Sequence, residues 1–255
     1  MKEDAPELLR QALASPRWEP EVIAMSGVTD CYQPVERKLK LTRRCLEVLA
    51  EFRNPVAIIT KNHLVTRDVD ILGEMAAWNG SVVNISITSL DEKLQRVMEP
   101  RTSTPARRLA AVEALAQAGI PVRVLAAPMI PGLNDHELPA ILKASADAGA
   151  RASSFIPLRL PWALKELFDT WLATHFPERR EKVLHRIREI RGGKLNDANF
   201  GSRMRGEGEY ANQLRTLYQA TVRKLGLNGE MPTLSIAHFR RPHDRSGQMG
   251  LFEAA

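Results

Sequence analysis

The stretch STPARRLAAVEALAQAGIPVRVLAAPMIPG, residues 103–132, predicts a helix followed by a buried strand. Thr104 suits the N-cap of the helix, Pro105 suits its first position, and Gly119 is a typical helix stop. The run 120–132 is short and largely apolar, which is typical of a strand in the interior of a parallel sheet. A helix that leads directly into such a strand indicates one repeat of an α/β fold.

The same alternation extends from residue 21 to residue 158. The other strand-like runs lie at 21–26, 55–62, 81–88 and 150–158, and helix-like stretches lie between them. Five repeats of about 30 residues predict an α/β fold, either an incomplete barrel or an open wound sheet. The stretch 134–149 is expected to be a helix that Asn134 or Asp135 caps and that ends at Gly149.

The pattern changes at Trp162. A long amphipathic helix is expected over 163–193, broken near Pro177, followed by a glycine-rich polar loop at 199–210 and another helix at 211–227. We therefore expect a core of βα repeats at 1–160, a C-terminal helical extension packed on it at 161–242, and a flexible tail at 243–255.

Composition limits the classes of function. The formal net charge is only +6, no apolar run reaches the ~20 residues of a membrane span, and no secretory signal opens the chain, so a cytoplasmic location is expected. Lys and Arg are concentrated in 178–194 and 239–245. Such basic stretches are most often solvated surfaces, and the alternative interpretation is contact with nucleic acid.

Polar side chains follow the predicted strands. In parallel α/β folds ligands bind beyond the carboxyl ends of the strands, so these residues are expected to meet at one rim. Their chemistry suits a zwitterionic or polyhydroxylated small ligand, with Lys61 or Arg101 binding a carboxylate and Asp30 binding an amine. The candidate site residues are Thr29, Asp30, Lys61, Ser86, Thr88 and Arg101. The alternative is that these residues are polar only because loops face water.

Several segments together resemble the radical S-adenosylmethionine (SAM) superfamily, specifically its spore photoproduct lyase-like branch. They are TDCYQPVE, ITKN, FGSRMRGEGEYA and the long run NISITSLDEKLQRVMEPRTSTPARRLAAVEALAQAGIPVRVLAAPMIPGLND. The resemblance covers residues 5–242 and implies a partial (β/α)6 TIM-like barrel, here without its first strand. It also implies reductive cleavage of SAM at a [4Fe-4S] cluster, which gives a 5′-deoxyadenosyl radical that abstracts hydrogen from a substrate.

The resemblance gives the candidate residues roles in binding SAM. The segment APMIPGLND is similar to the strand that flanks the adenine. The residues implied to bind SAM are Thr29 and Asp30 near the methionyl amine, Lys61 and Arg101 at the carboxylate, and Ser86 and Thr88 on the ribose side.

The sequence departs from the family at the metal centre. The family holds its cluster with a C-x3-C-x2-C motif on a loop after the first barrel strand, and the chain has only two cysteines, Cys31 and Cys45. No metal ligands are therefore expected, because Cys45 falls on an apolar helix face and Cys31 only neighbours the site. The six histidines show no ligand spacing either.

Three interpretations of this departure stay open. The sequence is an N-terminally truncated radical SAM protein that is inactive alone, or half of a split enzyme whose cluster lies on a separate polypeptide, or a genuine cluster-less protein. In the last case it would bind SAM or a nucleotide, or bind nucleic acid through its basic C-terminal helices.

Overall fold

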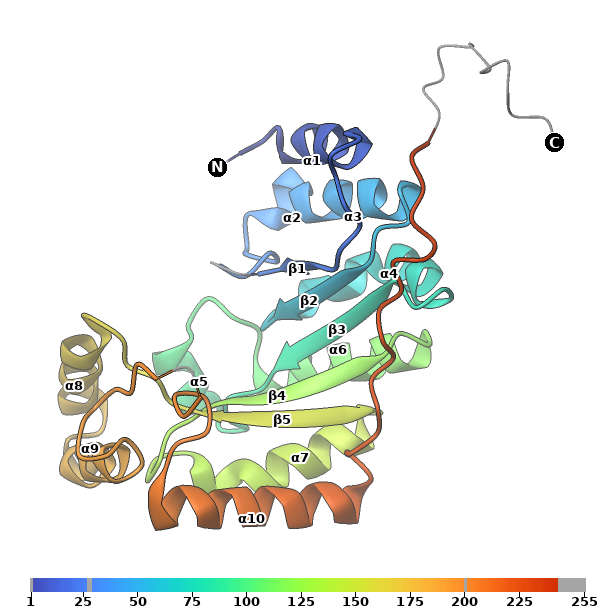
Figure 1. Cartoon of the computed structure of the whole chain (residues 1–255). Helices are drawn as coiled ribbons and strands as arrows, with labels where there is room; N and C mark the ends of the chain where they lie inside the picture. Colours follow the sequence, from blue (N-terminus) through green and yellow to red (C-terminus); the bar gives the residue numbers. More distant parts are fainter. Residues whose placement is uncertain (1, 27–28, 200, 243–255) are drawn as a thin grey trace, which may run out of the picture.

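The protein forms an open parallel sheet with helices packed against it (Figure 1). The computed structural model describes residues 2–26, 29–199 and 201–242. The sheet has the strand order β1-β2-β3-β4-β5. Its strands are β1 (Ile23–Met25), β2 (Val56–Thr60), β3 (Ser81–Ser86), β4 (Val122–Met129) and β5 (Ala152–Pro157). The prediction of an α/β fold is confirmed, and the sheet is not closed into a complete barrel.

Sequential strands are neighbours, and this order puts all carboxyl ends on one edge. Thr60 of β2 is in register with Ile85 of β3, and Ser86 of β3 is in register with Leu125 of β4. The residues that follow β1, β2 and β3 therefore meet at this edge, as the sequence predicted.

Helices cover the sheet and bury its apolar side chains. The helices and helical turns of this part are α1 (Ala5–Ala14), α2 (Glu36–Leu39), α3 (Leu41–Glu51), η1 (His63–Asp68), α4 (Val69–Ala76), α5 (Glu92–Met98), α6 (Pro105–Gln117), η2 (Asp135–Glu137) and α7 (Leu138–Asp147). The core includes Leu46 and Leu49 of α3, Ile58 of β2 and Leu115 of α6, all fully buried. Burial of such side chains stabilises the fold by roughly 1.5–3 kcal/mol each.

The start and end signals predicted for helix α6 are confirmed. The hydroxyl of Thr104 accepts a hydrogen bond from the backbone N–H of Arg107 at 3.4 Å, and Pro105 is the first helical residue. Gly119 follows the helix with a φ of +74°, a conformation that glycine adopts without strain.

The capping role predicted for Asn134 and Asp135 is wrong. The helix α7 begins at Leu138 without a side-chain cap, and the turn η2 precedes it. Asn134 is fully buried instead, and its amide nitrogen donates to the carbonyl oxygen of Thr88 at 2.7 Å. Asn134 therefore binds a segment far away in sequence and does not cap the helix that follows it.

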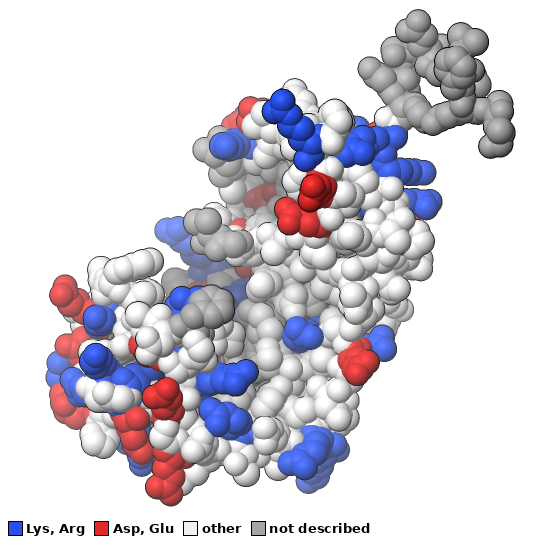
Figure 2. Space-filling view, viewed as in Figure 1, with Lys and Arg blue, Asp and Glu red and all other residues white. Residues whose placement is uncertain are grey.

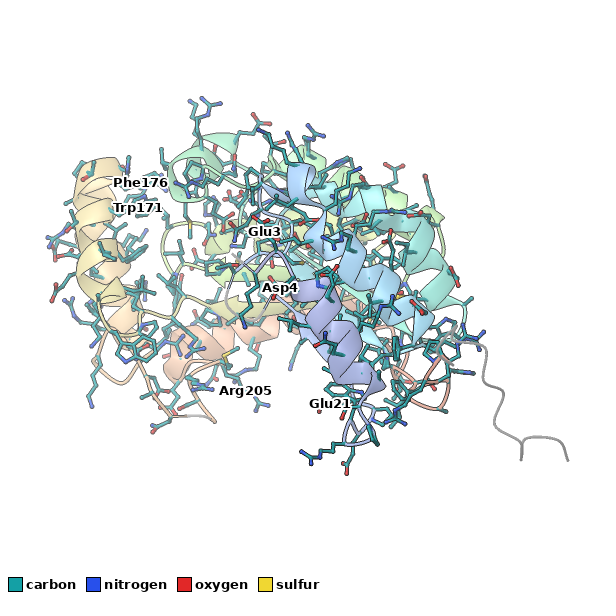
Figure 3. All side chains as sticks on the ribbon, turned by 90° about the horizontal axis from the view of Figure 1, so that it is seen from above. Glu3, Asp4, Glu21, Trp171, Phe176 and Arg205 are labelled. Atoms are coloured by element: carbon teal, nitrogen blue, oxygen red, sulfur yellow. The ribbon has the colours of Figure 1, made fainter. Side chains whose placement is uncertain are left out.

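The first C-terminal helices lie beyond the carboxyl edge of the sheet, and the last one packs along α7 (Figure 1). They are α8 (Leu164–His175), η3 (Pro177–Arg179), α9 (Arg180–Glu189) and α10 (Gly208–Leu225), so the predicted break near Pro177 is confirmed. Trp171 and Phe176 lie on the side of α8 that faces the sheet (Figure 3). The indole N–H of Trp171 donates to the carbonyl oxygen of Val97 at 3.1 Å, which fixes α8 to α5.

The chain after α10 crosses the amino ends of the strands (Figure 1). Asn228 pairs with Ala152 of β5, and the backbone N–H of Arg240 donates to the carbonyl oxygen of Phe52 at 2.9 Å. The predicted tail at 243–255 lies outside the described residues. Within the described part of the chain, no helix is long and apolar enough to cross a membrane.

Candidate functional site

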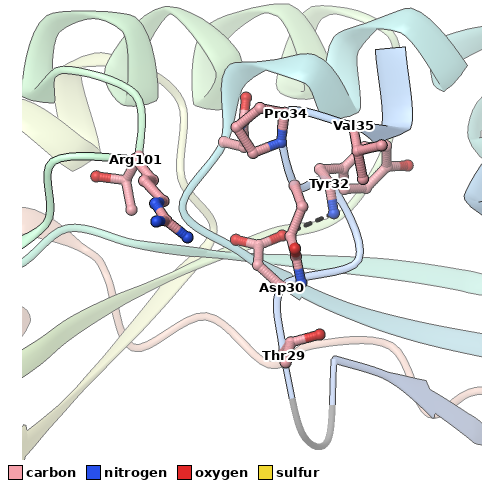
Figure 4. A pocket seen from close by; sticks show the side chains of 9 residues that line it. Thr29, Asp30, Tyr32, Pro34, Val35 and Arg101 are labelled. Carbon is pink, nitrogen blue, oxygen red and sulfur yellow. Dashed lines mark hydrogen bonds between the residues drawn. The ribbon is translucent and has the colours of Figure 1, made fainter. Parts of the chain in front are cut away.

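A cavity of about 630 Å³ opens at the carboxyl ends of β1 and β2 (Figure 4). Its size is within the range of about 300–1,000 Å³ that small-molecule sites occupy. The residues that line it are Thr29, Asp30, Tyr32, Gln33, Pro34, Val35, Asn62, Arg101 and Thr102. Three of the six predicted site residues, Thr29, Asp30 and Arg101, thus share one cavity.

Asp30 fixes the loop after β1 to the end of β2. Its carboxylate accepts hydrogen bonds from the backbone N–H of Tyr32 at 2.8 Å, the backbone N–H of Lys61 at 2.7 Å and the hydroxyl of Thr60 at 2.8 Å. The Thr60 hydroxyl also lies 3.0 Å from the second carboxylate oxygen, so each oxygen of Asp30 has two donor contacts within the protein. Asp30 still brings its negative charge to the cavity lining.

Arg101 lies on the other side of the cavity from Asp30 (Figure 4). Arg101 is exposed and forms no ion pair or side-chain hydrogen bond with any residue in 2–26, 29–199 or 201–242. The cavity therefore presents a cation and a carboxylate to the same space, an arrangement that suits a zwitterion.

Lys61 belongs to a neighbouring cluster rather than to the cavity lining. Its ammonium group pairs with the carboxylate of Glu99 and lies 3.5 Å from the hydroxyl of Thr88. The same carboxylate pairs with Arg108 at 2.7 Å. Burial alone would raise the pKa of Glu99, but the charges of Lys61 and Arg108 outweigh it and hold the pKa below its ordinary value.

Arg108, which the sequence did not single out, completes this cluster. Its side chain is almost completely buried and donates to the carbonyl oxygens of Ser86 at 3.0 Å and Ser103 at 2.8 Å. A signal was present, because Arg108 occupies the same helical stripe as the buried Ala111 and Leu115. A cation on an apolar stripe requires a buried partner, and here that partner is Glu99.

Ser86, predicted to lie on the ribose side of SAM, is buried at the end of β3. The backbone carbonyl of Ser86 accepts the bond from Arg108, which links β3 to the start of α6. The six predicted residues thus divide between the cavity, the Lys61–Glu99 cluster with Thr88, and the strand end.

The described residues do not fit an iron–sulfur cluster. Cys31 and Cys45 are both free and partly buried, and no group of three metal-ligating side chains occurs among the described residues. Burial raises the pKa of the Cys45 thiol to about 11 and raises that of the Cys31 thiol further. Two cysteines cannot supply the three thiolates that hold such a cluster in the family.

Known sequences contain relatives of this chain. The sequence profile of the radical SAM superfamily matches residues 2–144. An uncharacterised protein of Mycobacterium tuberculosis is 33% identical over 192 residues, which are 74% of this chain and 55% of that protein. An uncharacterised protein of Methanocaldococcus jannaschii is 31% identical over 137 residues, which are 54% of this chain and 49% of that protein. The chain thus spans about half the length of these curated relatives.

Solved structures of spore photoproduct lyase share the fold. One of them, with bound AdoMet and dinucleoside spore photoproduct, has a TM-score of 0.60 and 17% sequence identity, and the match covers 88% of this chain and 64% of that one. Another, complexed with dinucleoside spore photoproduct, has a TM-score of 0.59 and 16% identity over the same shares. The profile match over more than half of its residues shows that the chain belongs to the radical SAM superfamily.

Proposed function

We propose that this chain forms the SAM-binding part of a radical SAM enzyme. One observation carries the proposal: Arg101 and Asp30 face each other across a cavity of about 630 Å³ at the carboxyl edge of the sheet. The methionyl end of SAM carries a carboxylate and an ammonium group. Arg101 binds the carboxylate and the negative charge of Asp30 attracts the ammonium group, with Thr29 beside them.

Lys61 is the second cation for the SAM carboxylate in this proposal. Its ammonium group pairs with Glu99 but keeps partial exposure, so it can turn from Glu99 to a ligand anion at the same edge. Arg108 stays on Glu99 and keeps that carboxylate neutralised when Lys61 moves. Ser86 and Thr88, on β3 and after it, serve the ribose side.

The cluster ligands in this proposal come from outside the 255 residues. Two partly buried cysteines cannot provide the three thiolates that hold a [4Fe-4S] cluster in the family. The ligands then belong either to further residues of the same polypeptide or to a separate polypeptide. The chain as given would bind SAM without cleaving it, and the cluster would supply the electron for cleavage.

Equilibrium dialysis with radiolabelled SAM tests the proposal. We expect saturable binding of one SAM per chain, about 10–100-fold weaker in Arg101→Ala because a charge-assisted hydrogen bond is lost. Arg53→Ala, which removes an exposed arginine outside the cavity lining, is the matched control and should bind as the native chain does. Equal SAM affinity in both variants would contradict the assignment of the cavity.

Nucleic-acid binding through α8 and α9 is the second candidate. The spore photoproduct lyase neighbour binds a dinucleoside, and the net charge here is positive. Around α9, however, Arg180 pairs with Asp169 at 2.7 Å and Arg186 with Glu189 at 2.7 Å, and Figure 2 shows acidic and basic side chains mixed over this region. Binding of a short DNA that weakens steeply with salt would support this candidate, and no binding at low salt would contradict it.

A further inference from the structure

A second cavity lies at the other end of the carboxyl edge. Its volume is about 460 Å³, and the loop between α9 and α10 forms much of its wall. This loop lies beside the carboxyl ends of β4 and β5 (Figure 1). Among the residues that line the cavity are Lys165 of α8, Arg191, which is the second residue after α9, and Lys194 and Asn196 of the loop.

Arg191 is a buried cation without a carboxylate partner. The residue is only 4% exposed, and its guanidinium donates to three backbone carbonyls: those of Leu158 and Arg203 at 2.8 Å, and that of Pro157 at 3.3 Å. Among the described residues no carboxylate lies within ion-pair distance of Arg191, and its Nε–H has no acceptor. Burying a guanidinium is costly, and burial lowers the pKa of Arg191, while the charge of Asp197 opposes this lowering without forming an ion pair.

Arg159 adds a second cation to the same corner. It follows Leu158, whose carbonyl binds Arg191, and its charge also lowers the pKa of Arg191. One Nη of Arg159 contacts the sulfur of Met204 at 3.4 Å, and its buried Nε–H has no acceptor among the described residues. Two guanidiniums with unmet donors therefore lie close together at the end of β5.

The charges around the cavity leave a positive excess. Lys165, Arg191 and Lys194 line it, and the carboxylates among its described lining residues are Asp197 and Glu207. Arg159 lines a different, apolar pocket, and its charge reaches the cavity through its effect on Arg191. Asp197 is occupied, because it accepts from the hydroxyl of Ser202 and the backbone N–H of Asn199. An excess of two positive charges matches a phosphate monoester, which carries roughly −1.5 to −2 at neutral pH.

We propose that Arg159, Arg191, Lys165 and Lys194 form a binding site for a phosphate group of the substrate. This inference deepens the proposed function. It rests on that function in one respect, namely that the phosphate group belongs to the substrate of the enzyme. The first cavity holds SAM at the ends of β1 and β2, and the second holds the anionic end of the substrate at the end of β5. The substrate would then lie along the carboxyl edge of the sheet.

Arginine side-chain ¹⁵N–¹H spectra recorded during titration with inorganic phosphate test the site. Chloride at matched ionic strength is the reference. We expect saturable shifts of two Nε–H signals, assigned to Arg159 and Arg191 by their loss in Arg159→Gln and Arg191→Lys. Arg191 also holds the loop backbone, so if Arg191→Lys does not fold, Arg159→Gln and the lysine variants below carry the test.

The phosphate affinity of variants at Lys165 and Lys194 is the decisive measurement. Phosphate affinity should fall by about tenfold in the Lys165→Ala/Lys194→Ala double variant and stay within about twofold in Lys224→Ala, an exposed lysine of α10 outside the cavity. Identical shifts in phosphate and chloride, or unchanged affinity in the double variant, would overturn the proposal. SAM dialysis on the double variant separates the two sites: failure of SAM to bind while phosphate saturates would overturn the proposed function alone.

Discussion

The carboxylate of Glu99 lies 2.7 Å from the guanidinium of Arg108, and both groups are removed from water. Its other oxygen pairs with the ammonium group of Lys61 at the carboxyl edge of the sheet. Glu99 thereby connects a buried arginine of α6 to a residue of the proposed SAM site. Removing one member of a buried ion pair leaves an uncompensated charge, so this connection is sensitive to single substitutions.

Glu99→Gln should lower the free energy of unfolding by about 3 kcal/mol at pH 7, because it leaves Arg108 without a counter-charge. The pKa of Glu99 is lowered in the fold, so its stabilisation is present above the ordinary pKa of about 4.3 and is lost as pH falls through the lowered value. Urea unfolding at pH 7 and pH 3.5 measures the difference, which should shrink in acid. The exposed Glu92→Gln is the control, and a Glu99→Gln variant as stable as this control would contradict the account.

Lys61→Met should weaken SAM binding by about 10–100-fold, because a charge-assisted hydrogen bond to the ligand carboxylate is lost. Calorimetric titration with SAM measures the change. Lys93→Met removes an exposed lysine of the nearby helix α5 and should leave the affinity unchanged. Equal affinities of the two variants would show that Lys61 serves only the ion pair with Glu99.

Asn134→Ala should destabilise the protein by about 2 kcal/mol or more, because two buried backbone groups lose their partners. These are the carbonyl oxygen of Thr88 and the N–H of Ile130, which lie 2.7 Å and 2.6 Å from the Asn134 amide. Urea unfolding tests this against Asn212→Ala, in which the altered residue is exposed on α10. If Asn134→Ala loses no more stability than Asn212→Ala does, the prediction that Asn134 only caps a helix would stand instead.

The two thiols should react slowly with a disulfide reagent in the folded protein. A Cys45 pKa of about 11 leaves roughly 100-fold less thiolate at pH 8 than an ordinary cysteine has. Cys31 should react more slowly still, because burial raises its pKa further. Both should react at ordinary rates in denaturing urea. Fast labelling of either thiol in the native protein would contradict its structural role.

Local signals predicted most of the fold. The cap at Thr104, the stop at Gly119 and the break at Pro177 each act within a few residues, so the sequence alone located α6 and the junction between α8 and α9. The rim was predictable for a different reason, since a parallel sheet brings the residues after its strands to one edge.

The parts that failed depend on partners far along the chain. Asn134 has the right chemistry for a cap, but its amide binds Thr88 on another strand end, and no local pattern specifies that choice. Likewise, no sequence pattern near Lys61 predicts its ion pair with Glu99, which lies at the C-terminal end of the helix α5. Of these residues, only the burial of Arg108 could be predicted from the local sequence, because Arg108 lies on the apolar stripe of its helix.

The central claim is that this chain supplies the SAM site of a radical SAM enzyme and not the cluster ligands. The direct measurement is anaerobic reconstitution with iron and sulfide, followed by gel filtration and assay of iron, sulfide and bound radiolabelled SAM in the same sample. The account predicts SAM bound in proportion to protein, with no iron or sulfide retained. Four irons and four sulfides per chain, or no bound SAM at saturating concentration, would contradict it.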